Sequence, residues 1–183
     1  MNVLFKRAPK EHLVRESFLL LIVFIFMSCG TTKSQVNSTH KKEYDIINAH
    51  FNKGDDLILY HKSVENASWI KLINIDSITD RVGIPTFIED EELRKLLTEK
   101  VLSEVRTTIH NSTPLMFSKT ELPNLKLSAT NDSKNIKISK PVIVGNLAFL
   151  RRIDDLEIPI YIYKYDQGKW HIIYTFYEKL ILR

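Results

Sequence analysis

Cys29 is the residue whose type and position most clearly suggest chemistry. It is the single cysteine of the chain, it follows an uncharged apolar run at residues 18–27, and Ser28 and Gly30 flank it. A lone cysteine cannot form an internal disulfide, and it excludes a four-cysteine zinc site. In an oxidising compartment an unpaired thiol is a liability, which acylation would remove. The position of Cys29 at the end of the apolar run favours that modification.

The other reactive residue types do not form a catalytic or metal-binding motif. No two histidines have His-x-x-x-His spacing, no serine lies in a Gly-x-Ser-x-Gly elbow, and the acidic run 89–92 lacks the spacing of an EF-hand loop. His50 is expected near a helix end, where a cationic ring would suit the helix dipole. The sequence therefore predicts no catalytic residue, no metal and no cofactor.

Carboxylates far apart in the sequence could still pair in space. Asp56 with Asp154 or Asp155 is one such combination. Because sequence alone does not bring them together, surface solvation is the simpler expectation. These observations favour a non-enzymatic chain, with a site assembled from distant residues as the alternative.

Composition narrows the class of protein further. Of 183 residues, 44% are hydrophobic and 26% are charged, which is typical of one globular domain. Glycine occurs only 5 times, which argues against a glycine-rich nucleotide loop. The net charge is +4, and half of it comes from the first 28 residues. The remaining charge is too small and scattered for a nucleic-acid surface, so neither nucleotide nor nucleic acid is expected as a partner.

The N-terminal segment has the organisation of an export signal. Residues 1–17 are net basic, and the apolar run 18–27 spans roughly 15 Å as a helix, about half of a bilayer core. Phe26-Met27-Ser28-Cys29-Gly30 resembles the lipobox of bacterial lipoproteins, with Phe26 where leucine is usual, as in the looser lipoboxes of the Bacteroidetes group. The resemblance implies cleavage between Ser28 and Cys29 and lipidation of Cys29. The alternatives are a signal anchor or a secreted protein with a free thiol.

A polar tether is predicted between the lipid and the domain. Residues 29–41 hold the lipidated cysteine and this spacer, and residues 42–183 form a single globular domain. In lipoproteins of the Bacteroidetes type an acidic stretch after the cysteine tends to mark surface export. The first acid here is Glu43. That resemblance implies a periplasm-facing anchor in the cell envelope.

Two helices are predicted in the first part of the domain. Tyr44, Ile47 and Phe51 lie on one face of a helix over 42–53, and Gly54 is placed to end it. A longer helix is predicted over 90–109, with an apolar stripe that includes Leu97 and Val101. Strands are predicted over 57–62 and 69–75, and short strands or edges over 115–117, 125–127 and 136–138.

The strongest strand pattern lies at the C-terminal end. Strands are predicted over 142–152, 158–165 and 169–182, with a turn at 165–169 in which Gly168 takes a positive φ. Trp170, Ile172, Tyr174 and Phe176 are expected on one face of the last strand. The fold class is therefore α+β, with two main helices on a mostly antiparallel sheet that ends in a β-meander. The hairpin 164–170 resembles one in small Bacteroidetes lipoproteins and in cone-shaped folds of the nuclear-transport-factor type.

Three functions are compatible with these features. The first is a non-catalytic envelope lipoprotein that binds a protein partner and is held at the membrane through its lipid. The second is a domain for a small apolar ligand, in a pocket between helix and sheet lined by Leu97, Val101, Tyr161 and Phe176. The third is an envelope hydrolase with a site assembled from distant residues.

Overall fold

A computed structural model of the chain describes residues 40–51, 57–79, 84–85 and 88–180. All of these residues belong to one compact unit, residues 39–183. The predicted signal peptide, Ser28, Cys29 and almost all of the predicted tether lie outside the described residues, as do Gly54 and Asp56. Within the described residues, no helix is both long and apolar enough to cross a membrane.

Helices come first along the chain and the antiparallel sheet comes last, so the α+β class is confirmed. The elements are α2 Lys41–His50, β1 Ile58–Tyr60, the 3-10 helix η2 Ala67–Leu72, α3 Ile75–Thr79, β2 Ile84–Pro85, α4 Asp90–Leu96, α5 Glu99–His110, β3 Lys126–Ser128, β4 Lys137–Ile138, β5 Val142–Val144, β6 Leu147–Ile153, β7 Glu157–Asp166 and β8 Lys169–Leu180.

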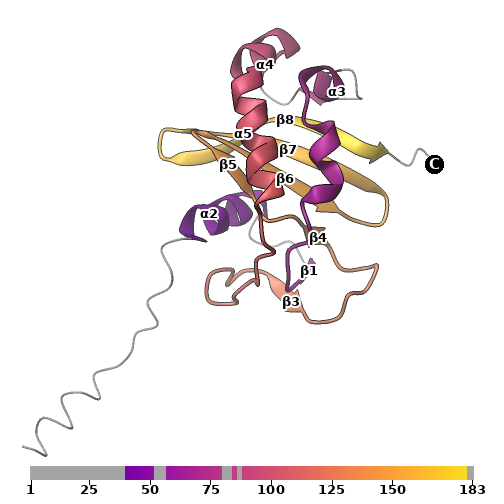
Figure 1. Ribbon diagram of the computed structural model, residues 1–183. Coiled ribbons are helices and arrows are strands. Elements are labelled where there is room, and N and C mark those ends of the chain that lie inside the picture. Colours follow the sequence, from indigo (N-terminus) through magenta and orange to yellow (C-terminus); the bar gives the residue numbers. More distant parts are fainter. Residues whose placement is uncertain (1–39, 52–56, 80–83, 86–87, 181–183) are drawn as a thin grey trace, which may run out of the picture. The chain divides into compact units, whose positions relative to one another are not determined.

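The main sheet has the strand order β2-β8-β7-β6-β4, and β5 also pairs with β6 (Figure 1). The strands β6, β7 and β8 form the predicted antiparallel meander. Strand β1 pairs with β3 in parallel, in a separate small sheet. Both faces of the meander are covered, which matches the apolar character of both faces in the sequence.

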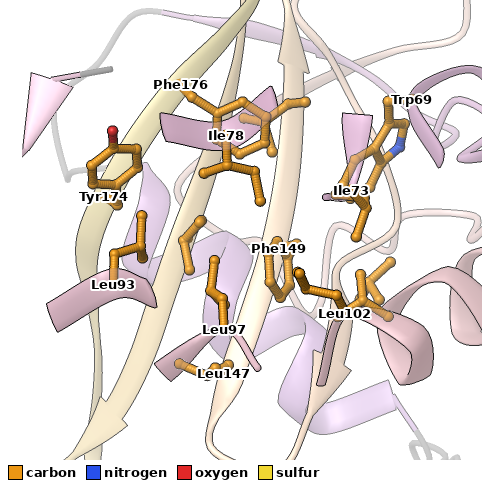
Figure 2. Packing of buried hydrophobic residues seen from close by; sticks show 14 of the residues in the cluster. Trp69, Ile73, Ile78, Leu93, Leu97, Leu102, Leu147, Phe149, Tyr174 and Phe176 are labelled. Atoms are coloured by element: carbon orange, nitrogen blue, oxygen red, sulfur yellow. The ribbon is translucent and has the colours of Figure 1, made fainter. Parts of the chain in front are cut away.

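One face of the sheet carries the first core cluster, which the helices η2, α3, α4 and α5 supply together with the sheet (Figure 2). Trp69, Leu97, Phe149 and Phe176 belong to it and are almost completely buried. The opposite face carries the second core cluster. There α2 and the segment 115–138 pack on Ala148, Leu150 and Tyr163 and on their neighbours in the sheet.

The helix predicted over 90–109 is two helices. At Leu97 the backbone leaves the α-helical region, and Thr98 is extended, with φ −62° and ψ 156°. The Thr98 side chain then accepts a hydrogen bond from the Val101 amide, which makes Thr98 the N-cap of α5. The apolar stripe is nevertheless continuous across the break, because Leu93, Leu97 and Leu102 are all buried.

The strand predicted over 69–75 is wrong. The residues form η2 and the start of α3, and Trp69 and Ile73 are buried on one side, four positions apart. That spacing is helical, but a short run with many large apolar residues also fits a buried strand, so the pattern was misread. The strand predicted over 142–152 is a hairpin, β5 and β6, because Gly145 with φ +59° turns the chain.

The predicted faces of the last strand are also wrong. Ile162 is opposite Tyr174, but its neighbour Tyr163 is opposite Ile172, so β8 has one extra residue at this point. Such a bulge moves the following side chains to the other face. As a result, Trp170 and Ile172 pack against the second core cluster, whereas Tyr174 and Phe176 belong to the first.

Candidate functional site

A histidine and a tyrosine form a polar contact inside the second core cluster. His50 is the last residue of α2, and its Nδ1 lies 2.6 Å from the hydroxyl of Tyr163 on β7. The apolar face of α2, which includes Tyr44 and Ile47, is packed against this side of the sheet. That packing places the end of the helix, and with it the imidazole, beside the strand.

Both partners of this contact are neutral near pH 7. Burial, with a contribution from the positive charge of Arg152, lowers the pKa of His50 to about 3. Burial raises the pKa of the Tyr163 hydroxyl well above its usual value. The expectation of a cationic ring at position 50 is therefore wrong, because the helix end is buried under the sheet and the desolvation penalty exceeds the gain from the helix dipole.

The hydrogen bond between His50 and Tyr163 forms with either tautomer of the neutral ring. The phenol O–H donates to an unprotonated Nδ1, or its oxygen accepts from a protonated Nδ1. Nε2 is buried and has no hydrogen-bond partner within the described part of the chain. His50 thus has one ring nitrogen that is buried without a hydrogen-bond partner among the described residues.

Arg152 lies on the same face of the sheet as these two residues. Leu150 is opposite Tyr161 in the β6–β7 ladder, and alternation along each strand puts Arg152 on the side of Tyr161 and Tyr163. Its Nη2 lies 3.3 Å from Oδ2 of Asp154. Its Nε, like Nε2 of His50, is buried and has no hydrogen-bond partner among the described residues.

Arg152 also lines an open pocket of about 460 Å³, at the end of the β6–β7 hairpin. We refer to it as the Arg152 pocket. Its walls combine three apolar residues with five charged ones. They are Leu57, Ile136 and Leu156, and Lys134, Arg152, Asp154, Asp155 and Glu157. The side chain of Leu156 is 45% exposed, so a large apolar group faces solvent at the rim.

The turn that carries the acidic residues is held by Asp154. Its Oδ1 accepts hydrogen bonds from the amides of Leu156 at 3.1 Å and Glu157 at 3.0 Å, while Oδ2 contacts Arg152. Both carboxylate oxygens are therefore engaged within the protein. Burial raises the pKa of Tyr161, which packs edge-on to the His50 ring, with centroids 4.5 Å apart. Tyr161 thus also stays protonated and neutral near pH 7.

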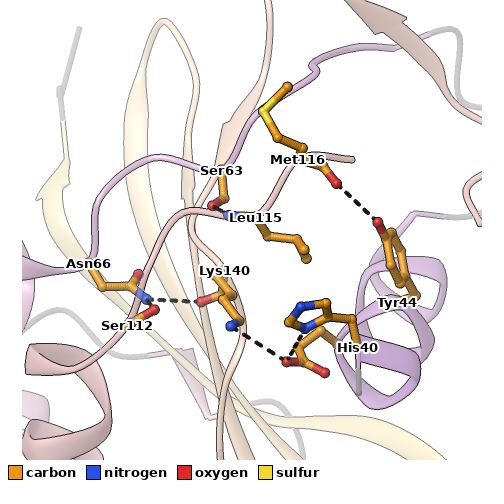
Figure 3. Close-up of polar contacts among 9 residues, drawn as sticks. His40, Tyr44, Ser63, Asn66, Ser112, Leu115, Met116 and Lys140 are labelled. Atoms are coloured by element: carbon orange, nitrogen blue, oxygen red, sulfur yellow. Dashed lines mark hydrogen bonds and ion pairs between the residues drawn. The ribbon is translucent and has the colours of Figure 1, made fainter. Parts of the chain in front are cut away.

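A second polar network reaches the first turn of α2 and has a structural role (Figure 3). Asn66 is buried, accepts from Trp69 Nε1 at 3.2 Å, and donates to Ser112 Oγ and to the Lys140 carbonyl. The Lys140 ammonium lies 3.8 Å from Glu43 on α2. These contacts satisfy buried polar groups and join segments that are distant in sequence, as a satisfied core network does.

The four residues predicted to line an apolar pocket are not brought together. Leu97 and Phe176 are buried members of the first core cluster, and Val101 packs against it, whereas Tyr161 packs against the second cluster on the opposite face of the sheet. The space between the helices and the sheet contains fully buried side chains such as Phe149 (Figure 2). The bulge in β8 and the alternation in β7 explain why pattern alone grouped Tyr161 with Phe176.

The other sequence candidates do not form a centre. No group of three or more histidine, cysteine or acidic side chains is placed to hold a metal ion within the described residues. His61 stacks on Tyr60, with ring centroids 5.0 Å apart. Of the carboxylate pair considered from sequence, Asp154 accepts a backbone hydrogen bond within its own turn and forms an ion pair with Arg152. Asp56 lies outside the described residues.

Sequence reasoning missed Arg152 and misinterpreted His50. The strand alternation did contain one signal, since a charged Arg152 follows the apolar run 147–150 on a face that Tyr161 and Tyr163 share.

Comparison with models of protein families, with curated proteins and with solved structures finds no match for this chain.

Proposed function

We propose that this chain is a lipid-anchored envelope lipoprotein whose domain is a non-catalytic binding module for a protein partner. One observation carries the binding part of the proposal, namely the Arg152 pocket on the surface of the domain. A partner bound there would remove the apolar walls and the exposed Leu156 from water, which favours binding. The charged residues of the pocket would make the binding selective.

The sequence supports the anchored part of the proposal. The basic start, the short apolar run 18–27 and the single Cys29 follow one another in the order of a lipoprotein signal. A mature cysteine carrying two or more acyl chains would hold the domain at a membrane without a transmembrane helix. The polar residues after it would let the domain face the periplasm.

The two alternative functions have less support. A cavity for an apolar ligand between helices and sheet would need Leu97, Val101 and Phe176 to face an open space, and Leu97 and Phe176 are 2% and 0% exposed. A hydrolase would need titratable groups that share a cleft and a hydrogen bond. His50 has such a bond, but to a buried phenol rather than to a nucleophile.

Fractionation of cells that express the full chain tests the anchor. We expect the wild type in the membrane fraction and a Cys29→Ala variant outside it. Ser28→Ala is the matched control, because it keeps a small residue before the cysteine and should leave attachment unchanged. Attachment of the Cys29→Ala variant that equals that of the wild type would contradict lipid anchoring.

Site-specific photo-crosslinking tests the binding surface. A photoreactive residue at Leu156, on the rim of the Arg152 pocket, should give one discrete adduct in intact cells. Met116 is the control position, because it is apolar and 57% exposed but does not line this pocket. Equal adduct patterns at both positions, or none at Leu156, would show that the pocket is not the binding surface.

A further inference from the structure

We propose that the domain docks on the lipid headgroups of the membrane that holds it, through an aromatic patch beside the turn between β7 and β8. This inference rests on the proposed lipid anchor and adds to it which end of the domain faces the membrane. The patch, called the hairpin patch below, consists of Tyr165, Trp170 and Ile172. None of these residues lines the Arg152 pocket.

The three side chains of the hairpin patch lie on the face of the sheet that α2 covers. Tyr165 is opposite Trp170 in the β7–β8 ladder, and their ring centroids are 5.1 Å apart. Ile172 is two positions from Trp170 and is opposite Tyr163, so it shares this face. Tyr165 is 46% exposed, and Trp170 and Ile172 are partly exposed although they pack against the second core cluster. The hairpin patch is thus the partly exposed margin of that cluster.

The residue types of the hairpin patch suit the headgroup layer of a bilayer. Tyrosine and tryptophan each combine an apolar ring with one polar atom, and they are enriched where one end of the side chain is in lipid and the other in water. The exposed charges of α2 and of the turn are nearly balanced, with Lys41, Lys42 and Lys169 against Asp45 and Asp166. Docking should therefore depend on the rings and only slightly on ionic strength.

The predicted tether joins the domain at the same end of the sheet. His40 is the N-cap of α2, and Figure 1 shows α2 below the end of the sheet that carries the turn between β7 and β8, where α2 contacts β8. Residues 30–39 separate Cys29 from His40, and a flexible polar chain of this length has an r.m.s. span of about 20 Å. A lipid at Cys29 would make docking intramolecular, so a weak contact of two aromatic rings would suffice.

The Arg152 pocket lies at the other end of β7. Its acidic residues belong to the turn that precedes β7, whereas the turn beside the hairpin patch follows β7. The strand has 10 residues, so its two ends are about 30 Å apart. With the hairpin patch on the membrane, the Arg152 pocket is directed away from the lipid and is open to a protein partner.

Quenching of tryptophan fluorescence by brominated lipid provides the test. The mature protein, purified from membranes, is reconstituted into vesicles of phosphatidylethanolamine and phosphatidylglycerol, with or without bromine on the acyl chains near the headgroup. The chain has two tryptophans and Trp69 is 0% exposed, so loss of emission in the brominated vesicles reports Trp170. We expect this loss in the wild type, at low and at high salt, and none in Trp170→Phe, which keeps Trp69 alone.

A tryptophan at the opposite end of the domain is the matched control. Leu156→Trp, made in the Trp170→Phe background, places an indole on the rim of the Arg152 pocket at a position that is 45% exposed. Its emission should not be quenched. Equal quenching of the tryptophans at positions 156 and 170 would overturn the proposed orientation.

Vesicle flotation separates failure of the docking from failure of the anchor. Protein that floats with the vesicles but whose Trp170 is not quenched would overturn the docking and leave the anchor standing. Protein that does not float would contradict both. A photoreactive residue at position Tyr165 that crosslinks to a protein rather than to lipid in intact cells would overturn the lipid assignment and assign the hairpin patch to a protein partner.

Discussion

His50 Nδ1 and the Tyr163 hydroxyl lie 2.6 Å apart and join the end of α2 to the central strand β7. The contact crosses 113 positions of sequence and lies in the interior of the second core cluster. Because both groups are neutral, it orders the imidazole without burying a charge at that point.

Removal of the Tyr163 hydroxyl should destabilise the domain. In Tyr163→Phe the packing of the ring is kept but His50 Nδ1 loses its partner, so we expect a loss of about 1–3 kcal/mol in the free energy of unfolding. Urea denaturation measures the change. Tyr165→Phe is the control, since Tyr165 is 46% exposed and should change stability little. An unaltered free energy in Tyr163→Phe would mean that the contact contributes nothing.

Stability should fall as the pH is lowered from about 6.5 toward 3, because of His50. In this interval the unfolded chain binds a proton at His50, whereas the folded protein, with a His50 pKa of about 3, does not. The unfolded state then holds more protons, which gives a slope of about 1.4 kcal/mol per pH unit from this residue. Above about pH 6.5 the contribution of His50 is constant.

The variant His50→Gln separates the contribution of His50 to this slope from that of the carboxylates that titrate in the same range. We expect the free energy of unfolding of the variant to depend less on pH than that of the wild type between pH 6 and 4. The comparison uses slopes, so a uniform loss of stability in the variant does not affect it. Equal slopes in the two proteins would show that His50 is accessible to protons in the folded state.

Two substitutions in the turn between β7 and β8 should change the free energy of unfolding in opposite directions. Gln167 and Gly168 have φ of +48° and +81°, a pair of left-handed residues that favours asparagine followed by glycine. Gln167→Asn should raise the free energy of unfolding by a few tenths to about 1 kcal/mol. Gly168→Ala should lower it by about 1 kcal/mol through backbone strain alone, because an added Cβ would meet no atom within 4 Å. Thermal unfolding reports both signs.

The first core cluster should behave as a closed core. Leu97→Ala should cost about 2–5 kcal/mol, because Leu97 is 2% exposed and its removal leaves a cavity. Val101→Ala is the comparison, since Val101 is only partly buried and should cost less. A nearly unchanged free energy of unfolding in Leu97→Ala, together with contact between Leu97 and a bound apolar ligand, would contradict a closed core. It would support the ligand pocket predicted from sequence.

The parts of the fold that local patterns specify could be predicted. The meander of β6, β7 and β8 follows from alternation, and the turn at Gly168 follows from residue type. Predictions from local patterns failed where a single residue changes the face of a strand or the boundary of a helix. The extra residue near Ile173 moved Tyr174 and Phe176 to the other face, and Thr98 divided a continuous apolar stripe into two helices.

The candidate site could not be predicted for a different reason. His50, Arg152 and Tyr163 come from a helix and two strands, and only the packing of α2 on the sheet brings His50 beside Tyr163. The burial that neutralises His50 is a property of that packing. At position 50 alone, a histidine at a helix end is consistent with a cationic ring, so local sequence favoured the wrong protonation state.

The intact mass of the protein from the membrane fraction tests the central claim most directly, because the proposed anchor at Cys29 would decide where the proposed binding module works. The account predicts a chain that begins at Cys29 and carries the added mass of two or three acyl chains. A chain that keeps residues 1–28, or one that begins elsewhere with an unmodified Cys29 thiol, would contradict it.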